Sequence, residues 1–278
     1  MSIATAVVDA HVHIHACYEL EELLDNAHLN LSSAPPSGAV RNGPGGQALF
    51  LLMTESARDD YFGALYEESR TGPTAGSGSR RWSMFPTEEE VSLCAASGAR
   101  RLFIVAGRQV ACREGLEVLV LGTRRRFTDG LPIREVLAET ESLGVPRVIP
   151  WGAGKWLFRR GRLLNELVRE FHGPTLFLGD EGGRPVFWGY PAHFEAAARL
   201  GVRDLPGTDP LPFPHDVNKV GRMGFRLELD LDPARPADSL MNALAVQGAP
   251  LARFAVLESP LRFVRNQIGM QLRKHHLA

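Results

Sequence analysis

The chain has 278 residues, of which 44% are hydrophobic, enough for one large domain or two smaller ones. Its formal net charge of −1 gives no overall attraction to nucleic acid or to an acidic membrane, so neither is expected as a partner. The three cysteines form no CxxC pair, which argues against a disulfide framework and a zinc ribbon. With no leader-like start and no apolar run of roughly 20 residues, we expect a cytoplasmic protein without a membrane span, and an oligomer is possible.

Apolar, β-rich runs alternate with helical patterns along the chain. Strands are predicted at 6–13, 48–53, 101–105, 116–121, 147–150, 175–178 and 202–205, with a possible eighth at 225–229. Helices are predicted at 18–26, 87–96, 133–143, 161–171 and 191–200. This alternation predicts an α/β fold, a single distorted (β/α)7–8 TIM-like barrel over residues 1–259. An open doubly wound sheet is the alternative, although no Gly-rich dinucleotide fingerprint follows the first strand.

Two stretches and the tail stand apart from this pattern. Residues 30–46 and 71–83 are rich in Gly, Pro or Ser and are predicted to be loose loops. Residues 260–278 place Leu261, Val264, Ile268 and Leu272 at helical spacing, with Arg262, Arg265, Arg273 and Lys274 between them. The pattern predicts a basic amphipathic helix packed on or beside the barrel, with a docking surface for a partner or acidic lipid as the alternative.

The first predicted strand ends in three histidines at alternate positions, His11, His13 and His15. Alternate residues of a strand share one face, and active sites of parallel barrels lie at the C-terminal ends of the strands. We therefore expect His11 and His13 to bind one divalent ion, which we take to be zinc, manganese or iron. His15 is left open as a ligand, a proton shuttle or a loop residue.

Acidic residues follow two later strands. Asp209 comes after Gly207 and Thr208, where a carboxylate can bind the ion or act as a general base. Asp180 and Glu181 end the strand before "GG", so Asp180 is a further candidate for the metal and for catalysis. Glu117 lies inside an apolar strand and is not expected to be a ligand.

The segment "VVDAHVHIH" resembles the opening motif of two superfamilies, the amidohydrolases and the polymerase and histidinol phosphatase (PHP) family of metal-dependent phosphoesterases. Later segments resemble the PHP family more. Thr54 and Glu55 match its second-strand motif, and Asp209 matches its last metal motif. Gln109 stands where the family has a bridging glutamate, and Leu211 stands where it has a histidine. These departures imply fewer ions than the usual cluster of the family, and we expect one.

The resemblance implies a PHP-like barrel and a metal-dependent hydrolase, with a phosphoesterase acting on a small anionic substrate preferred. Lys155, in "PWGAGKW", and Arg184 are then expected to hold the anion, with Asp209 and Asp180 at the reacting centre. Residues expected in the second shell or near the substrate are His15, Glu55, Gln109, Glu181 and Arg108. The alternatives are an amidohydrolase acting on a C–N or C–O bond, and a degenerate domain that binds an anion without turnover.

Overall fold

The structure, a computed structural model, describes residues 2–36, 40, 43–72 and 81–277. Its strands are β1 (Ser2–Val12), β2 (Gln47–Met53), β3 (Ser83–Pro86), β4 (Ser92–Ser97), β5 (Arg100–Val105), β6 (Gly107–Ala111), β7 (Glu117–Leu121), β8 (Arg147–Pro150), β9 (Leu176–Gly179), β10 (Arg203–Asp204), β11 (Gly224–Leu231) and β12 (Ala252–Phe254). The helices are α1 (Leu20–Ser32), α2 (Tyr61–Thr71), α3 (Ile133–Glu141), α4 (Phe158–Phe171), α5 (Ala192–Ala198), the 3-10 helix η1 (Pro214–Lys219), α6 (Pro236–Ala245) and α7 (Pro260–Leu277).

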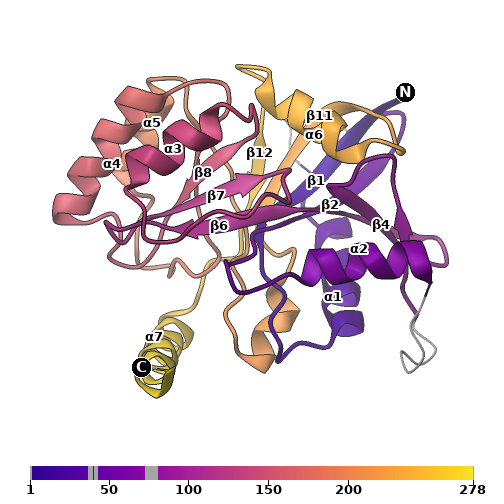
Figure 1. Ribbon diagram of the computed structural model, residues 1–278, viewed down its shortest axis with the longest axis horizontal. Coiled ribbons are helices and arrows are strands. Elements are labelled where there is room, and N and C mark those ends of the chain that lie inside the picture. The colour runs from indigo at the N-terminus through magenta and orange to yellow at the C-terminus, as the bar shows by residue number, and fades with distance from the viewer. Residues whose placement is uncertain (1, 37–39, 41–42, 73–80, 278) are drawn as a thin grey trace.

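The strands form two open sheets, so the predicted single distorted TIM-like barrel is wrong (Figure 1). The larger sheet has the order β12-β11-β1-β2-β5-β4-β3, and the smaller has the order β10-β9-β8-β7-β6. Closure of a barrel would need a ladder between β2 and β6, but β2 pairs in parallel with β5. Between the sheets, the described residues show a bridge from Glu55 to Arg108 at one junction, and at the other two backbone hydrogen bonds, from Ala10 N to Pro206 O and from Asp209 N to His11 O.

Antiparallel pairing is the second departure from the expected alternation. β11 runs antiparallel to β1, and β6 and β7 form an antiparallel pair. The segment 87–96, predicted as a helix, instead contains β4, which pairs with β5 from Ser92 to Ser97. Its Glu88-Glu89-Glu90 run favours a helix locally, but tertiary pairing with the buried β5 decides the conformation. The loop predicted at 71–83 lies mostly outside the described residues, and the one at 30–46 lies partly outside them.

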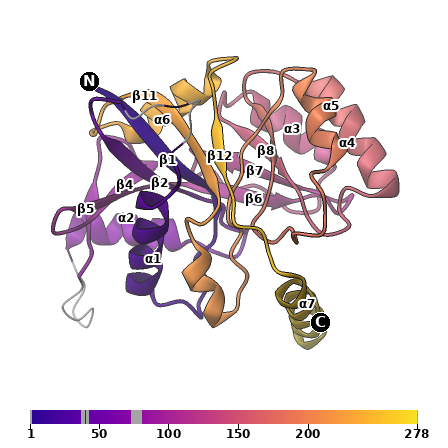
Figure 2. The same cartoon turned by 180° about the vertical axis from the view of Figure 1, so that it is seen from behind.

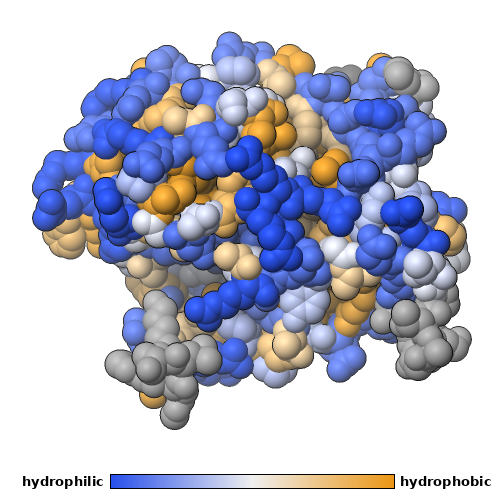
Figure 3. Space-filling model, viewed as in Figure 1, coloured by the Kyte–Doolittle hydropathy of each residue, from blue (hydrophilic) through white to orange (hydrophobic). Residues whose placement is uncertain are grey.

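The core has three apolar clusters, one on each side of the two-sheet arrangement and one between the sheets. Ala6, Val8, Phe50 and Leu119 belong to the central cluster. Helices α1 and α2 pack on the larger sheet, whereas α3, α4 and α5 cover the outer face of the smaller one (Figures 1 and 2). On the face shown in Figure 3, hydrophilic residues form a band across the middle and hydrophobic ones form small separate patches.

Helix α7 lies at the edge of the molecule, apart from the two sheets (Figure 2). Its contacts with the rest of the protein include Phe263, whose ring lies 5.8 Å from that of Phe187, and Gly269, which lies against Phe213. Its four aliphatic residues are exposed, at 82% for Leu261, 51% for Val264, and 57% each for Ile268 and Leu272. The sequence predicted that this apolar side would pack inward. Within the described chain, no helix is long and apolar enough to span a lipid bilayer.

The junction between the sheets yields a stability prediction. A Cβ atom on Gly107 would lie 2.3 Å from the carbonyl oxygen of Met53 and 2.9 Å from that of Val120. Because both neighbours are backbone, we expect Gly107→Ala to lower the free energy of unfolding by about 2 kcal/mol or more. The matched control is Gly189→Ala, whose Cβ would meet nothing within 4 Å. Equal urea midpoints for the two variants would contradict this close approach.

Candidate metal centre

A shift in strand register near the end of β1 turns the histidines toward the space between the sheets. Before it, Ala4, Ala6 and Val8 face the central cluster. The pairing of β1 with β2 shifts register between Asp9 and Val12, and beyond the shift Val12 faces the other cluster. Such an irregularity re-aims the side chains that follow it, so His11 and His13 take the inner face.

The two imidazoles and one carboxylate converge on a single point. The Nε2 atoms of His11 and His13 are 3.0 Å apart. Asp209 Oδ1 lies 3.5 Å from the first of these atoms and 3.6 Å from the second. A point in the plane of the three atoms and equally far from each lies about 2.0 Å away, the bond length that zinc makes with nitrogen and oxygen ligands. These three side chains are the group among the described residues whose ligand atoms lie close enough to hold an ion.

Neighbouring polar groups orient the two imidazoles. Glu181 Oε1 lies 3.4 Å from His11 Nδ1, the nitrogen that faces away from the convergence point. Thr54 Oγ1 lies 3.4 Å from His13 Nε2, and Gln109 Oε1 lies 3.2 Å from His11 Nε2. A carboxylate behind a histidine fixes the ring and its tautomer, as is usual for metal-binding imidazoles. Gln109 adds a neutral oxygen beside the cluster, where a carboxylate would add charge.

Asp209 reaches the histidines because its loop lies directly on β1. The backbone N–H of Asp209 donates to His11 O at 2.8 Å, and its φ of 46° lies in the left-handed region. A Cβ on Gly207 would lie 2.4 Å from the backbone nitrogen of His11, so glycine is required there. The strained φ persists only because the surrounding contacts hold it, which is common at functional sites.

Buried Asp9 anchors this loop to the strand. Its Oδ1 accepts from the backbone N–H of Thr208 at 2.8 Å and from that of His11 at 3.2 Å. Its Oδ2 accepts from the Thr208 hydroxyl and from the N–H of Gly221 at 2.8 Å. Burial raises the pKa of Asp9 to about 6, although these hydrogen bonds act in the opposite direction.

The charges of the cluster are strongly coupled. Burial alone would lower the pKa of His11, but the carboxylates of Asp209 and Glu181 raise it to about 9. Burial and the charge of His11 lower the pKa of His13 to about 3. Burial opposes ionisation of Asp209, yet the two histidines lower its pKa to about 2, whereas burial and Asp209 raise the pKa of Glu181 to about 8. Without an ion, the cluster therefore retains protons at neutral pH that a cation would replace.

Lys155 lies close to this cluster, in the loop after β8. Its Nζ donates to Glu117 Oε2 at 2.5 Å. Burial would lower the pKa of Lys155, but Glu117 and Glu181 raise it, so the amine stays charged. The sequence did not predict a role for Glu117. A charged residue at the start of the apolar strand "EVLVL" was the available signal.

Other predicted site residues have partners elsewhere. Asp180 accepts hydrogen bonds from Arg184, at 2.7 Å from Nε and 2.8 Å from Nη2, and pairs with Arg253. Asp180 and Arg184 thus form a buried ion pair apart from the two histidines. His15 Nε2 contacts Pro210 O at 2.8 Å, and its ring stacks on His13.

Glu55 and Arg108 pair with each other at the junction between the sheets. Glu55 accepts from the N–H of Phe62 at 2.8 Å, in the first turn of α2, and pairs with Arg108 at 3.1 Å. Arg108 also contacts Asp60. Three further arginines also have protein partners, namely Arg125 with Glu139, Arg126 with Asp60, and Arg124 over the ring of Tyr66.

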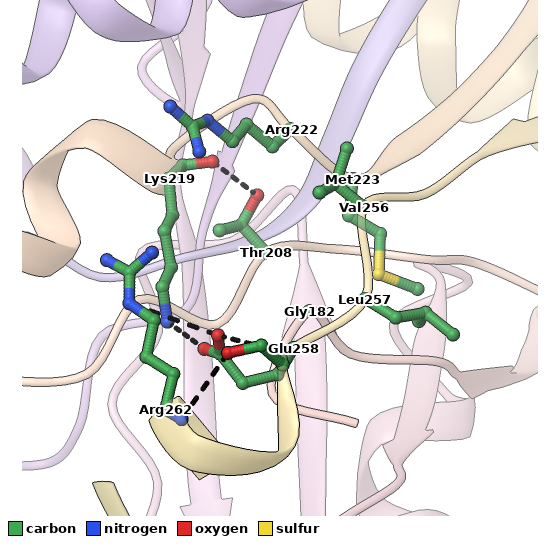
Figure 4. Close-up of a pocket in the computed structure, with 10 residues that line it drawn as sticks. Gly182, Thr208, Lys219, Arg222, Met223, Val256, Leu257, Glu258 and Arg262 are labelled. Atoms are coloured by element: carbon green, nitrogen blue, oxygen red, sulfur yellow. Dashed lines mark hydrogen bonds and ion pairs between the residues drawn. The ribbon is translucent and has the colours of Figure 1, made fainter. Parts of the chain in front are cut away.

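A hollow of about 150 Å³ lies beside the cluster, lined by Gly182 and Thr208 but not by the candidate ligands (Figure 4). Lys219 donates to Glu258 there, and the guanidinium of Arg262 lies on the same side (Figure 4). Because Lys219 also pairs with Asp216 at 3.1 Å, its charge is neutralised inside the protein.

Comparison with known proteins finds similarity in fold. No protein-family model and no curated protein matches the chain. The crystal structure of PsfC from Pseudomonas syringae PB-5123 aligns with a TM-score of 0.54 at 17% identity, over 98% of this chain and 99% of that one. The lesion-specific endonuclease PfuEndoQ from Pyrococcus furiosus aligns with a TM-score of 0.50 at 12% identity, over 90% of this chain. The match covers 57% of the endonuclease.

The expectation that nucleic acid is not a partner is corrected by this comparison. One solved structure of similar fold is that of a lesion-specific endonuclease. The net charge of −1 does not exclude nucleic acid, because it sums over the whole chain and hides local differences. Helix α7, for example, has no acidic residue. Nucleic acid is therefore no longer excluded as a partner, and the comparison does not identify the substrate of this chain.

The first prediction for the cluster concerns metal content. We expect wild-type protein to bind close to one equivalent of Zn²⁺ or Mn²⁺, because three ligand atoms converge on one point. His13→Ala should weaken binding by at least about 100-fold, since one of three protein ligands is lost. Titration calorimetry and elemental analysis measure this. His172→Ala, at an exposed histidine, is the control and should bind normally.

The second prediction concerns pH. Binding displaces a proton from His11, whose pKa is about 9 in the metal-free protein, so affinity should rise with pH. Mn²⁺ affinity should increase up to roughly tenfold per pH unit between pH 6 and 8 for each proton released. Calorimetry in buffers of different ionisation enthalpy counts these protons. A flat affinity over that range would mean that His11 is already neutral.

Proposed function

We propose that the protein is a metal-dependent hydrolase of the PHP-like kind that cleaves a phosphoester. The observation that carries this proposal is the triangle formed by His11 Nε2, His13 Nε2 and Asp209 Oδ1, with Glu181 behind His11. Two imidazoles and a carboxylate are a donor set for zinc, manganese or iron, and a catalytic site needs positions left open to water and substrate. A bound ion would supply Lewis-acid activation of water and stabilise negative charge that develops on the substrate.

The side chains around the triangle have separate roles in this proposal. Asp209 and the two histidines hold the ion, and Glu181 keeps His11 in the tautomer that presents Nε2. Lys155, a charged amine paired with Glu117, binds a phosphoryl oxygen as a point charge. His15, whose ring stacks on His13, remains a candidate for moving a proton at the edge of the site. Asp180 and Arg184 are given no catalytic role, because they pair with each other.

Gln109 supports a single ion over a bridged pair. It lies within 3.2 Å of His11, at the position where the PHP motif has a bridging glutamate. A neutral amide oxygen cannot balance the charge of a second divalent ion as a carboxylate does. The observed donor set therefore favours one ion.

The amidohydrolase alternative is less well supported. Its two-metal form uses a lysine carboxylated on its amine, which requires that the amine lose its proton. Lys155 has a raised pKa and donates to Glu117, which opposes that reaction. The third alternative, a domain that binds an anion without turnover, predicts metal binding but no hydrolysis.

Hydrolysis of model substrates tests the proposal. Mn²⁺- or Zn²⁺-loaded protein should hydrolyse p-nitrophenyl phosphate or its bis-ester, and Asp209→Asn should lower kcat/KM by at least about 100-fold, since a charged ligand is lost. Lys155→Met should raise KM with metal content unchanged, and Arg199→Met, at an exposed arginine, is the control.

Activity on an amide or lactone panel alone would favour the amidohydrolase alternative. Metal binding without turnover of any panel member would favour the binding domain. Cleavage of a lesion-containing duplex in preference to small esters would identify nucleic acid as the substrate class.

A further inference from the structure

The exposed aliphatic side chains of α7 form one continuous stripe, which we call the α7 stripe: Leu261, Val264, Ile268 and Leu272. Their spacing of three, four and four residues places them on one face over three helical turns. The opposite face of α7 holds Asn266, which is buried, and Phe263, which contacts Phe187. The helix is thus seated on the protein by a mixed face, and its apolar face is turned to solvent.

A hollow follows the α7 stripe. About 750 Å³ of open space is lined by Leu261, Val264 and Ile268, together with His215 of η1, Ser259, Arg262 and Arg265. A ridge of aliphatic side chains beside such a hollow is the shape that a second amphipathic helix fits. Exposed apolar surface that is contiguous in this way marks an interaction site.

We propose that the partner is a second copy of this chain, with two α7 helices packed antiparallel about a two-fold axis. The α7 stripe is nearly unchanged when its direction is reversed. In an antiparallel pair centred near Asn266, Leu261 lies opposite Leu272 of the other copy, and Val264 lies opposite Ile268. An isologous contact requires this self-complementarity, because the same patch serves both subunits. The pairing also fills the hollow beside each stripe with the ridge of the other copy.

The salt dependence of binding distinguishes a second copy of the chain from an anionic partner. Residues 260–277 contain no Asp or Glu, and Arg265, exposed beside the α7 stripe, donates to His215 at 2.6 Å. In the antiparallel pair the two copies of Arg265 lie on the same side, close to the axis, and repel each other. Salt screens that repulsion and leaves apolar contact intact. The self-pairing should therefore strengthen with salt, whereas binding to nucleic acid, acidic lipid or an acidic protein should weaken.

Sedimentation velocity on the full chain at 5–100 µM (roughly the range for moderate affinities) tests the proposal. Wild-type protein should sediment as a dimer, more so at high than at low salt. Ile268→Glu should shift it to monomer, raising the dissociation constant at least about 100-fold. Leu29→Glu, at a residue of α1 that is 62% exposed, is the control and should remain dimeric. Circular dichroism checks that each variant is folded.

A second variant tests the orientation of the pair. Arg265→Glu replaces the like charges near the axis with another pair of like charges, but a mixture with wild-type protein brings opposite charges together. The mixed dimer should therefore exceed its statistical share in native mass spectrometry. A wild-type monomer at both salt concentrations, or a dimer insensitive to Ile268→Glu, overturns the proposal. So does binding to anionic vesicles or to duplex DNA that Ile268→Glu abolishes while wild-type protein remains monomeric.

Discussion

The buried carboxylate of Asp9 is the contact on which the rest of the site depends. It joins β1 to a loop about 200 residues later in the chain (Thr208 pairs with it at a separation of 199). Burying a carboxylate carries a large desolvation cost, which four hydrogen bonds offset here. With Thr208 held in this way, Gly207 lies against His11 and the backbone of Asp209 adopts its left-handed conformation. The candidate ligands meet because the hydrogen bonds to the Asp9 carboxylate hold this loop against β1.

The open arrangement of the two sheets determines where the candidate metal centre lies. β1 belongs to the larger sheet, whereas Gln109, Glu117 and Glu181 come from the smaller one or its loops. The candidate centre therefore lies at the junction between the sheets, where few main-chain hydrogen bonds cross. A buried cluster of carboxylates and imidazoles at such a junction favours binding of a cation. One ion would reduce the repulsion between Asp209 and Glu181 and would offset the desolvation cost of their charges.

Local sequence predicted the parts of this site that depend on one strand or one turn. The period of two in β1 placed His11 and His13 together, and the strand at 147–150 has its predicted bounds. Long-range partners could not be predicted. Arg253 lies 73 residues from Asp180 in the sequence and pairs with it, a contact that no local pattern indicates. The pairing of β2 with β5 leaves the barrel open, and the pairing of β4 with β5 overrides the helical preference of residues 87–96.

X-ray absorption spectroscopy at the metal edge of Zn²⁺-loaded protein tests the central claim most directly. We predict nitrogen and oxygen neighbours at about 2.0–2.1 Å, with the outer-shell pattern of two imidazoles and no sulfur at about 2.3 Å. In His13→Ala the pattern should fall to one imidazole or the ion should be lost. A sulfur neighbour, or two imidazoles that persist in His13→Ala, would contradict binding of the ion by His11, His13 and Asp209.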